Sequence, residues 1–298
     1  MIYTKKYEIR EHQGAIFSLT KDNTFIYTAS ADRYVTRWNP FTGLQDTFVI
    51  KCESSIYKII HFKHKNILVV GTSNGDIHII DSENKSELKF IKFHNVAVFE
   101  IQIDEFNQRM YIGDADGNLS VWNTDNWILI LNLPFDCGKI RAIDFLGEDL
   151  NKLVIGSQDG YVRIIETNYY NLITSFNTHN GGCLALSETE FKKNILFSSG
   201  KDGYIRAWKI DTCKEVIAIP AHNESIYKII EKNGLLYSIS RDKTLKIWDS
   251  NSLNFIFKIE RKIGGHTHSI NDLLFFDDLL FTVGDDKRII CWETSSIK

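Results

Sequence analysis

The sequence lacks the features of several protein classes. Its 298 residues contain no apolar run of about 18 residues, the length that a membrane-spanning helix requires. Only 3 prolines are present and 12% of the residues are aromatic, which is typical of a compact domain rather than a disordered chain. The formal net charge is −3, without the basic excess common in nucleic-acid binding proteins. We therefore expect no membrane and no nucleic acid among its partners.

Cysteines are few and scattered. The 5 cysteines at positions 52, 137, 183, 213 and 291 form no C-x-x-C pair, which argues against a disulfide framework or a zinc site. The sequence instead predicts buried free thiols in a reducing compartment. Residues 1–12 alternate and are charged, unlike a secretory signal. We expect a cytoplasmic protein that uses no metal and no cofactor.

What the sequence does contain is an internal repeat. An acidic or amide residue recurs every 40 to 44 residues, and a Trp or Ile stands six residues after it. The recurring residues are Asp32, Asn74, Asp116, Asp159, Asp202, Asp242 and Asp286. The residues six positions later are Trp38, Ile80, Trp122, Ile165, Trp208, Trp248 and Trp292. Seven copies fill the chain, so we predict a single domain over residues 1–298.

Each copy contains four short segments of alternating polarity separated by Gly, Asn and Asp turns. Residues 235–240 ("LLYSIS") and 244–249 ("TLKIWD") are two such segments, and no helical period lies between them. One four-stranded sheet cannot bury both of its faces alone, whereas seven arranged radially can. The predicted fold is therefore all-β, a seven-bladed β-propeller of four-stranded antiparallel sheets.

At these residues the chain resembles the WD-repeat β-propeller family over its whole length. The family's pattern places a His about 26 residues before the Trp. The pairs with this spacing are His12 and Trp38, His222 and Trp248, and His266 and Trp292. His94 precedes Trp122 by 28 residues, and His179 precedes Trp208 by 29. Copies two and four depart from the pattern, with Cys52 and Ile80 in one and Asp136 and Ile165 in the other.

The first segment of the chain predicts how the ring closes. Residues 3–12 resemble residues 213–222, which precede the His of copy six, and the last copy stops at its third segment. We therefore expect the first segment to complete the last sheet as its outer strand, which would remove two open sheet edges.

The resemblance implies a chain of hydrogen bonds from the Trp indole to a hydroxyl, from the hydroxyl to His, and from His to the turn Asp. Four copies contain all four residue types: His12, Thr28, Asp32 and Trp38; His179, Ser198, Asp202 and Trp208; His222, Ser238, Asp242 and Trp248; and His266, Thr282, Asp286 and Trp292. These include the residue types of a Ser-His-Asp triad. A triad needs one reactive centre rather than four equivalent ones, so we interpret each set as a structural clamp between strands and predict no enzyme.

The same resemblance indicates where partners would bind. An apolar residue four positions after the His is expected to pack between blades, and its neighbours, with the residue before the turn Asp, commonly line the partner-binding face in WD-repeat proteins. The predicted partner-binding residues on the narrow face around the central channel are Phe17, Tyr57, Phe99, Lys139, Arg141, Leu184, Lys201, Tyr227 and Arg241. Aromatic and Arg side chains dominate interface energetics. We predict a protein or peptide partner with apolar or aromatic anchors and some acidic character, bound by a monomeric propeller within a complex.

Other interpretations stay open. The aromatic residues could simply close the channel or pack on neighbouring blades. The channel could serve a small ligand or an enzyme, although only Asp285 is acidic among the face positions. A third alternative is a structural subunit held through the blade sides, where Trp127 is expected on an outer strand. Residues 114–118 lack the later ligands of a calcium loop, and His266 fits the clamp better than a metal pair with His268.

Overall fold

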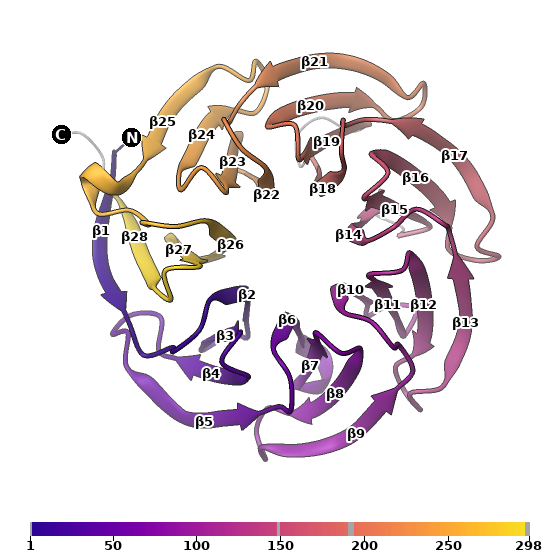
Figure 1. The fold of residues 1–298 in the computed structure, drawn as a ribbon, viewed down its shortest axis with the longest axis horizontal. Helices are drawn as coiled ribbons and strands as arrows, with labels where there is room; N and C mark the ends of the chain where they lie inside the picture. Colours follow the sequence, from indigo (N-terminus) through magenta and orange to yellow (C-terminus); the bar gives the residue numbers. More distant parts are fainter. Residues whose placement is uncertain (1, 148–149, 190–193, 296–298) are drawn as a thin grey trace.

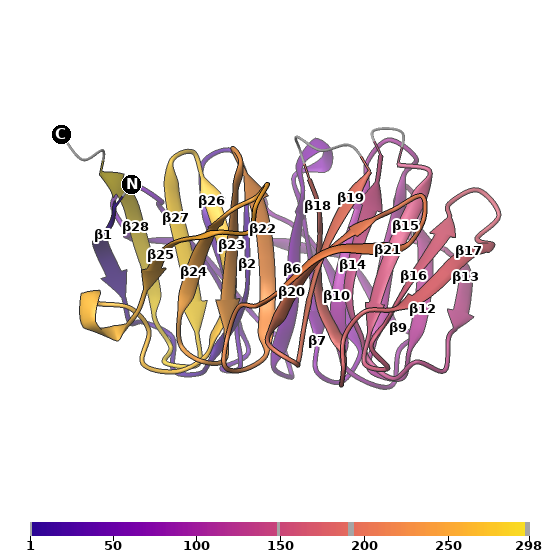
Figure 2. The same cartoon turned by 90° about the horizontal axis from the view of Figure 1, so that it is seen from above.

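A computed structural model describes residues 2–147, 150–189 and 194–295. These residues form seven four-stranded antiparallel sheets around a central channel, as predicted (Figure 1). Seen from the side, the ring is a flat disc (Figure 2). We number the sheets blades 1 to 7 in the order of their inner strands. The predicted domain also includes residues 1, 148–149, 190–193 and 296–298, which lie outside the described residues.

Four sets of strands build the blades. The inner strands are β2 (Ile16–Lys21), β6 (Ile56–Phe62), β10 (Val98–Asp104), β14 (Ile140–Leu146), β18 (Cys183–Glu188), β22 (Ile226–Lys232) and β26 (Ile270–Phe276). The second strands are β3 (Ile26–Ser30), β7 (Ile67–Thr72), β11 (Arg109–Asp114), β15 (Lys152–Ser157), β19 (Ile195–Gly200), β23 (Leu235–Ser240) and β27 (Leu279–Gly284). The third strands are β4 (Tyr34–Trp38), β8 (Asp76–Asp81), β12 (Asn118–Asn123), β16 (Tyr161–Glu166), β20 (Tyr204–Lys209), β24 (Leu245–Asp249) and β28 (Ile289–Ser295). The outer strands are β5 (Gln45–Lys51), β9 (Ser86–Lys92), β13 (Leu129–Pro134), β17 (Leu172–Asn177), β21 (Lys214–Pro220), β25 (Phe255–Ile259) and, for blade 7, β1 (Ile2–Ile9). Two short 3-10 helices, η1 (Lys63–Lys65) and η2 (Arg261–Ile263), complete the described elements.

Burial changes from the second strands to the outer strands. Every residue of β3 and β7 is buried, because both faces of these strands pack against neighbouring blades. The outer strand β13 instead alternates between half-buried and exposed residues. A strand with one face in solvent shows this period of two. The sheets therefore stack face to face around the ring, and their outer strands carry most of the exposed strand residues on its outside.

The apolar core is divided into seven clusters, and each cluster joins two neighbouring blades. Leu68 of blade 2, for example, packs in the same cluster as Tyr27 of blade 1. Leu236 of blade 6 shares a cluster with Phe197 of blade 5. The remaining clusters follow the same rule around the described ring. Each sheet thus depends on both of its neighbours to bury its apolar residues.

The first strand closes the ring as predicted. Strand β1 pairs antiparallel with β28, from Ile2 opposite Ser295 to Ile9 opposite Ile289. In Figure 1 the indigo β1 lies beside the yellow β28. The side chain of Tyr3 is buried between blades, where its hydroxyl forms a hydrogen bond of 2.8 Å with the hydroxyl of Tyr237. Blade 7 therefore combines β1, from the beginning of the sequence, with β26, β27 and β28, from its end.

Two expectations about single residues need correction. Four of the free cysteines are buried as predicted, but Cys213 is only half-buried. Trp127 lies in the turn before β13 rather than on that outer strand, and it packs against the cluster between blades 2 and 3. Its φ of 58° and the bond from its backbone N–H to the carbonyl of Asn123 belong to the turn. The linear sequence does not distinguish this turn position from the strand that follows.

Candidate partner-binding site at the channel mouth

Each inner strand carries a one-residue irregularity immediately after its first residue. In blade 1, Ile16 lies opposite Ser30 and Ser18 opposite Ala29, which leaves Phe17 without an opposite residue. The seven residues in this position are Phe17, Tyr57, Phe99, Arg141, Leu184, Tyr227 and Asn271. A β-bulge of this kind redirects side chains. We call these seven residues the bulge ring.

The bulge places a second set of side chains in the channel. Simple alternation would turn the residue after the bulge away from the channel. The sequence therefore did not indicate that this residue lines the channel. The residues in this position are Ser18, Lys58, Glu100, Ala142, Ala185, Lys228 and Asp272, and all of them line the channel. We call them the inner ring. A bulge repeated in every copy could have been suspected only from the strand pairing, which the sequence does not show.

The structure brings all nine predicted partner-binding residues to one cavity. Its volume is about 800 Å³. The residues are Phe17, Tyr57, Phe99, Lys139, Arg141, Leu184, Lys201, Tyr227 and Arg241. The members that belong to the bulge ring are half-buried, whereas Lys139, Lys201 and Arg241 are exposed around them. The cavity includes the end of the channel at which the inner strands begin and reaches inward as far as Asp144.

Aromatic rings line one side of the mouth. The rings of Phe17 and Tyr57 meet edge to face with centroids 5.1 Å apart. Tyr57 stacks on Phe99 at 5.4 Å with an interplanar angle of 8°. The three residues therefore pack on one another across blades 1 to 3, as the packing alternative expects, and their half-buried state leaves part of each ring open to the channel. We call them the aromatic row.

Cations continue the aromatic row into blade 4. The guanidinium of Arg141 lies 4.4 Å from the centroid of Phe99, and the ammonium of Lys139 lies 5.4 Å from it. Both distances are within the range of a cation–π interaction. Burial lowers the pKa of Arg141, although the nearby Tyr227 and Glu100 oppose this change. An Arg guanidinium is not deprotonated in proteins, so the side chain brings a positive charge to the mouth.

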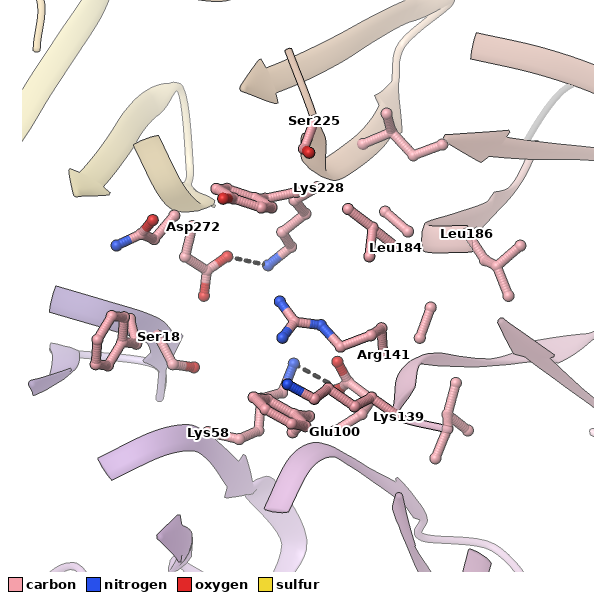
Figure 3. A pocket seen from close by; sticks show the side chains of 18 of the residues that line it. Ser18, Lys58, Glu100, Lys139, Arg141, Leu184, Leu186, Ser225, Lys228 and Asp272 are labelled. Carbon is pink, nitrogen blue, oxygen red and sulfur yellow. Dashed lines mark hydrogen bonds and ion pairs between the residues drawn. The ribbon is translucent and has the colours of Figure 1, made fainter. Parts of the chain in front are cut away.

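The inner ring carries two ion pairs between neighbouring blades. Lys58 Nζ lies 2.5 Å from Glu100 Oε1, and the ammonium of Lys228 pairs with the carboxylate of Asp272 (Figure 3). Burial opposes the charge of Lys58, but Glu100 and Asp272 outweigh burial and raise its pKa. Deeper in the channel, burial raises the pKa of Asp144 to about 7, and the carboxylates of Glu100 and Glu188 add to this effect. The channel is therefore a charged environment in which four charges of the inner ring are matched in pairs.

The four predicted clamps form hydrogen-bonded chains. In blade 6, the indole N–H of Trp248 donates to Ser238 Oγ at 2.9 Å, and the two nitrogens of His222 lie 2.8 Å from Ser238 Oγ and 2.9 Å from Asp242. The same contacts occur in blades 1, 5 and 7. Burial lowers the pKa of His222. A neutral imidazole that donates from Nδ1 to the carboxylate and accepts the hydroxyl proton at Nε2 gives every group a partner.

The hydroxyls of the clamps are inaccessible to a substrate. Thr28, Ser198 and Ser238 are 0% exposed, and Thr282 is 1% exposed. Each also accepts a hydrogen bond from an indole N–H. A nucleophile must reach its substrate, so these oxygens are placed to hold strands together rather than to attack a carbonyl group.

Blades 3 and 4 contain variants of the clamp that the sequence pattern did not identify. In blade 3, His94 bonds to Ser120 and Asp114, and Trp122 donates to the same serine. The expected acidic residue of this copy, Asp116, makes no contact with His94 through its side chain in the described structure. In blade 4, the guanidinium of Arg163 bonds to both Ser157 and Asp159 and takes the place of the missing His.

Two further observations concern alternatives considered above. Within the described ranges, no group of three or more His, Cys, Asp or Glu side chains could hold a metal ion. His268 is exposed and contacts Thr267, while His266 belongs to the blade 7 clamp. None of the helices in the described part of the chain has the length and hydropathy that spanning a bilayer requires.

The ring of seven sheets and its repeated Trp–hydroxyl–His–Asp chains define a WD-repeat β-propeller. The family model "WD domain, G-beta repeat" matches residues 3–39 and 257–293, each match running from an outer strand through the third strand of the next blade. The chain is also similar to the nuclear pore complex protein nup43 of Dictyostelium discoideum, with 23% identity over 181 residues. That alignment covers 51% of this chain and 43% of the relative, so the match spans less than half of the relative's length.

Proposed function

We propose that this protein is a non-catalytic interaction scaffold that holds a partner peptide or domain at the mouth of its central channel. The proposed partner is a protein segment with an apolar or aromatic anchor and acidic residues. We further propose that the propeller acts as one subunit of a complex, without a cofactor and without direct contact with nucleic acid or membrane.

The observation that carries this proposal is the continuous contact from Phe17 through Tyr57 and Phe99 to Arg141. These four residues come from four consecutive blades and remain partly open to the channel mouth. Partly exposed aromatic and Arg side chains that cluster in a concave site are typical of interface hot spots. Exposed Lys201 and Arg241 on blades 5 and 6 add positive charge beside the aromatic row, which favours an acidic partner.

Affinity purification followed by mass spectrometry tests the proposal. The variant Phe17→Ala/Tyr57→Ala/Arg241→Ala removes two rings and one charge from the mouth. We expect it to lose the partners that the unaltered protein captures, because hot-spot residues each contribute roughly 2 kcal/mol or more. Its melting temperature should stay close to that of the unaltered protein, because none of the three side chains is fully buried.

A matched control is available on other parts of the surface. The variant Phe106→Ala/Tyr169→Ala/Arg261→Ala removes the same three residue types from exposed positions outside the channel. It should keep the captured partners. Retention of all partners by the channel-mouth variant would show that the mouth is not the binding site.

A second candidate function is a structural subunit held through the blade sides. Its support is the similarity to a nuclear pore complex protein and the apolar side chains exposed on outer strands, such as Leu88 and Phe90 of β9 and Ile130 of β13. Footprinting separates the two candidates. Protection of Ile130 and the neighbouring Trp127 within a purified complex, with Phe17 left reactive, would favour blade-side contacts.

The place of action in the cell is also a proposal. The composition favours the cytoplasm, whereas the relative's name favours the nuclear envelope. Imaging of a fluorescent fusion distinguishes the two: a diffuse cytoplasmic signal supports the first, and a rim around the nucleus supports the second together with the blade-side role.

A further inference from the structure

In the described channel the half-buried guanidinium of Arg141 has no ion-pair partner, and the other unpaired cations of the lining, Lys139, Lys201 and Arg241, are exposed at the mouth. Among the lining residues that the structure describes, Lys58 and Lys228 each pair with a carboxylate, whereas Arg141 makes neither an ion pair nor a hydrogen bond. The guanidinium instead lies over the face of Phe99. An enclosed charge without a partner is costly to a folded protein. The side chain of Arg141 is therefore placed for a group that the chain itself does not supply.

The space beside Arg141 can accept such a group. The inner ring contributes Ala142 in blade 4 and Ala185 in blade 5, where blade 1 places Ser18 and the remaining blades place Lys, Glu or Asp. Figure 3 shows Arg141 extended toward the middle of the channel, with the Lys228–Asp272 pair on one side and the Lys58–Glu100 pair on the other. Leu184 and Leu186 border the same region. The small residues leave part of the cavity open next to the guanidinium.

We propose that the guanidinium of Arg141 receives a carboxylate that the partner inserts into the channel mouth. This inference rests on the proposed function and names the group that the partner must carry. The planar guanidinium matches a carboxylate through two parallel hydrogen bonds. The adjoining Phe99 and Leu184 provide apolar contacts for the methylene groups that carry the carboxylate, and the aromatic row takes a neighbouring apolar anchor.

The surrounding charges favour one negative charge over two. Of the cations that line the channel, Lys58 and Lys228 of the inner ring are already paired with Glu100 and Asp272, whereas Lys139, Lys201 and Arg241 belong to its mouth. A carboxylate matches the single charge of Arg141, whereas a phosphate dianion would bring a second negative charge that the paired inner ring does not neutralise. The carboxylate could belong to an Asp or Glu side chain or to the end of a chain, and the experiment below separates these sources.

The test uses the complete protein and two display libraries of random twelve-residue peptides. In one library the peptide is flanked by carrier sequence on both sides, and in the other it ends in a free carboxylate. Selected peptides are synthesised with and without replacement of each Asp or Glu by the amide, or with an amidated end. Affinities are measured by calorimetry for the unaltered protein and for Arg141→Gln.

We expect selected peptides to contain one essential carboxylate. Its conversion to an amide should weaken binding at least about 30-fold, and Arg141→Gln should have a similar effect. The peptide in which the carboxylate is replaced by an amide should bind Arg141→Gln almost as tightly as it binds the unaltered protein. The two changes remove the same contact, so their effects should not add. Arg141→Lys should recover part of the affinity, since Lys keeps the charge but not the paired geometry. An essential carboxylate found only in the free-ended library identifies a chain terminus as its source.

The carboxylate inference and the proposed function predict different results, so each of them can fail without the other. Arg261→Gln, which removes an exposed charge on η2, should bind the peptides as the unaltered protein does. Peptides that lose binding with the Phe17→Ala/Tyr57→Ala/Arg241→Ala variant but tolerate the amide replacements would overturn the carboxylate inference and leave the proposed function intact. A strong preference for phosphopeptides over their Glu counterparts would also overturn it. Failure to select any peptide that depends on the mouth would contradict both.

Discussion

At the scale of single residues, Ser120 illustrates what linear spacing could not reveal. The hydroxyl of a clamp was expected four positions before the turn residue, and copy three has Ile112 there. Ser120 lies opposite Ile112 in the ladder and supplies the hydroxyl from the third strand instead. Residues directly opposite in a sheet are close enough to replace one another. Thr36 of blade 1, in the same register as Ser120, also contacts His12 and is the signal that could have identified this arrangement.

Asp32 is the residue at which a clamp can best be tested by pH. Burial by itself would raise the pKa of Asp32, but hydrogen bonds from His12 and from the backbone N–H groups of Gln13 and Tyr34 lower it from 3.8 to about 2. The pKa is lower in the folded state than in the unfolded state, so the carboxylate stabilises the fold fully above pH 3.8. This contribution is lost as the pH falls through about 2.

Asp32→Asn should therefore lower the free energy of unfolding by about 1–3 kcal/mol at pH 7, because the amide cannot accept all of these hydrogen bonds. The difference from the unaltered protein should shrink as the pH is lowered from about 4 to about 2. Urea unfolding at several pH values measures it. Asp278→Asn, at an exposed position, serves as the control and should have little effect. A difference that is the same at every pH would show that the carboxylate charge is not what stabilises the clamp.

At the scale of strands, the sequence predicted the alternation of the inner strands and the closure of the ring by the first strand, but it did not predict the bulges. Alternation identified the first residue of each inner strand, and these residues are buried as expected, from Ile16 in blade 1 to Ile270 in blade 7. The residue after each of them varies from Phe17 to Asn271, so no residue type marks the bulge. Because the bulge shifts the period by one, the sequence indicated the bulge ring and missed the inner ring with its ion pairs.

Strand β1 gives a prediction at this scale. Deletion of residues 1–9, of which residue 1 lies outside the described structure, removes the outer strand of blade 7 together with the buried Tyr3 and Ile9. The melting temperature should fall sharply, because β28 then presents an unpaired edge and the cluster beside Tyr237 loses a ring. Thermal unfolding followed by circular dichroism measures the change.

A synthetic peptide of residues 2–10 provides the matching rescue experiment. Added to the shortened protein, it should raise the melting temperature in a concentration-dependent manner, because it binds the folded state alone. A peptide of the same composition in scrambled order should not. An identical melting curve for the shortened and the complete protein would rule out ring closure by β1.

At the scale of the whole molecule, the shared cores predict a single unfolding transition. Leu68 and Leu236 are both fully buried, in clusters that lie between different pairs of blades. Leu68→Ala and Leu236→Ala should each lower the free energy of unfolding by about 2–5 kcal/mol. Each should also shift the entire transition, so that tryptophan fluorescence and circular dichroism report the same midpoint.

Leu172→Ala is the matched control, because this leucine of β17 is 54% exposed. It should change the stability by less than about 0.5 kcal/mol. Two resolved transitions, of which only one moves in each core variant, would mean that groups of blades unfold independently.

Shared cores also bear on how such a chain can evolve. Loss or gain of one copy of the repeat would leave two half-clusters facing water, whereas a changed side chain within a copy is absorbed locally. Blades 2 and 4 show the second kind of change: each has an isoleucine, Ile80 or Ile165, at the tryptophan position and still fills its sector of the circle. We therefore expect the number of copies to be constrained more strictly than the sequence of any one copy, and the side chains at the channel mouth, which fill no shared core, to tolerate change.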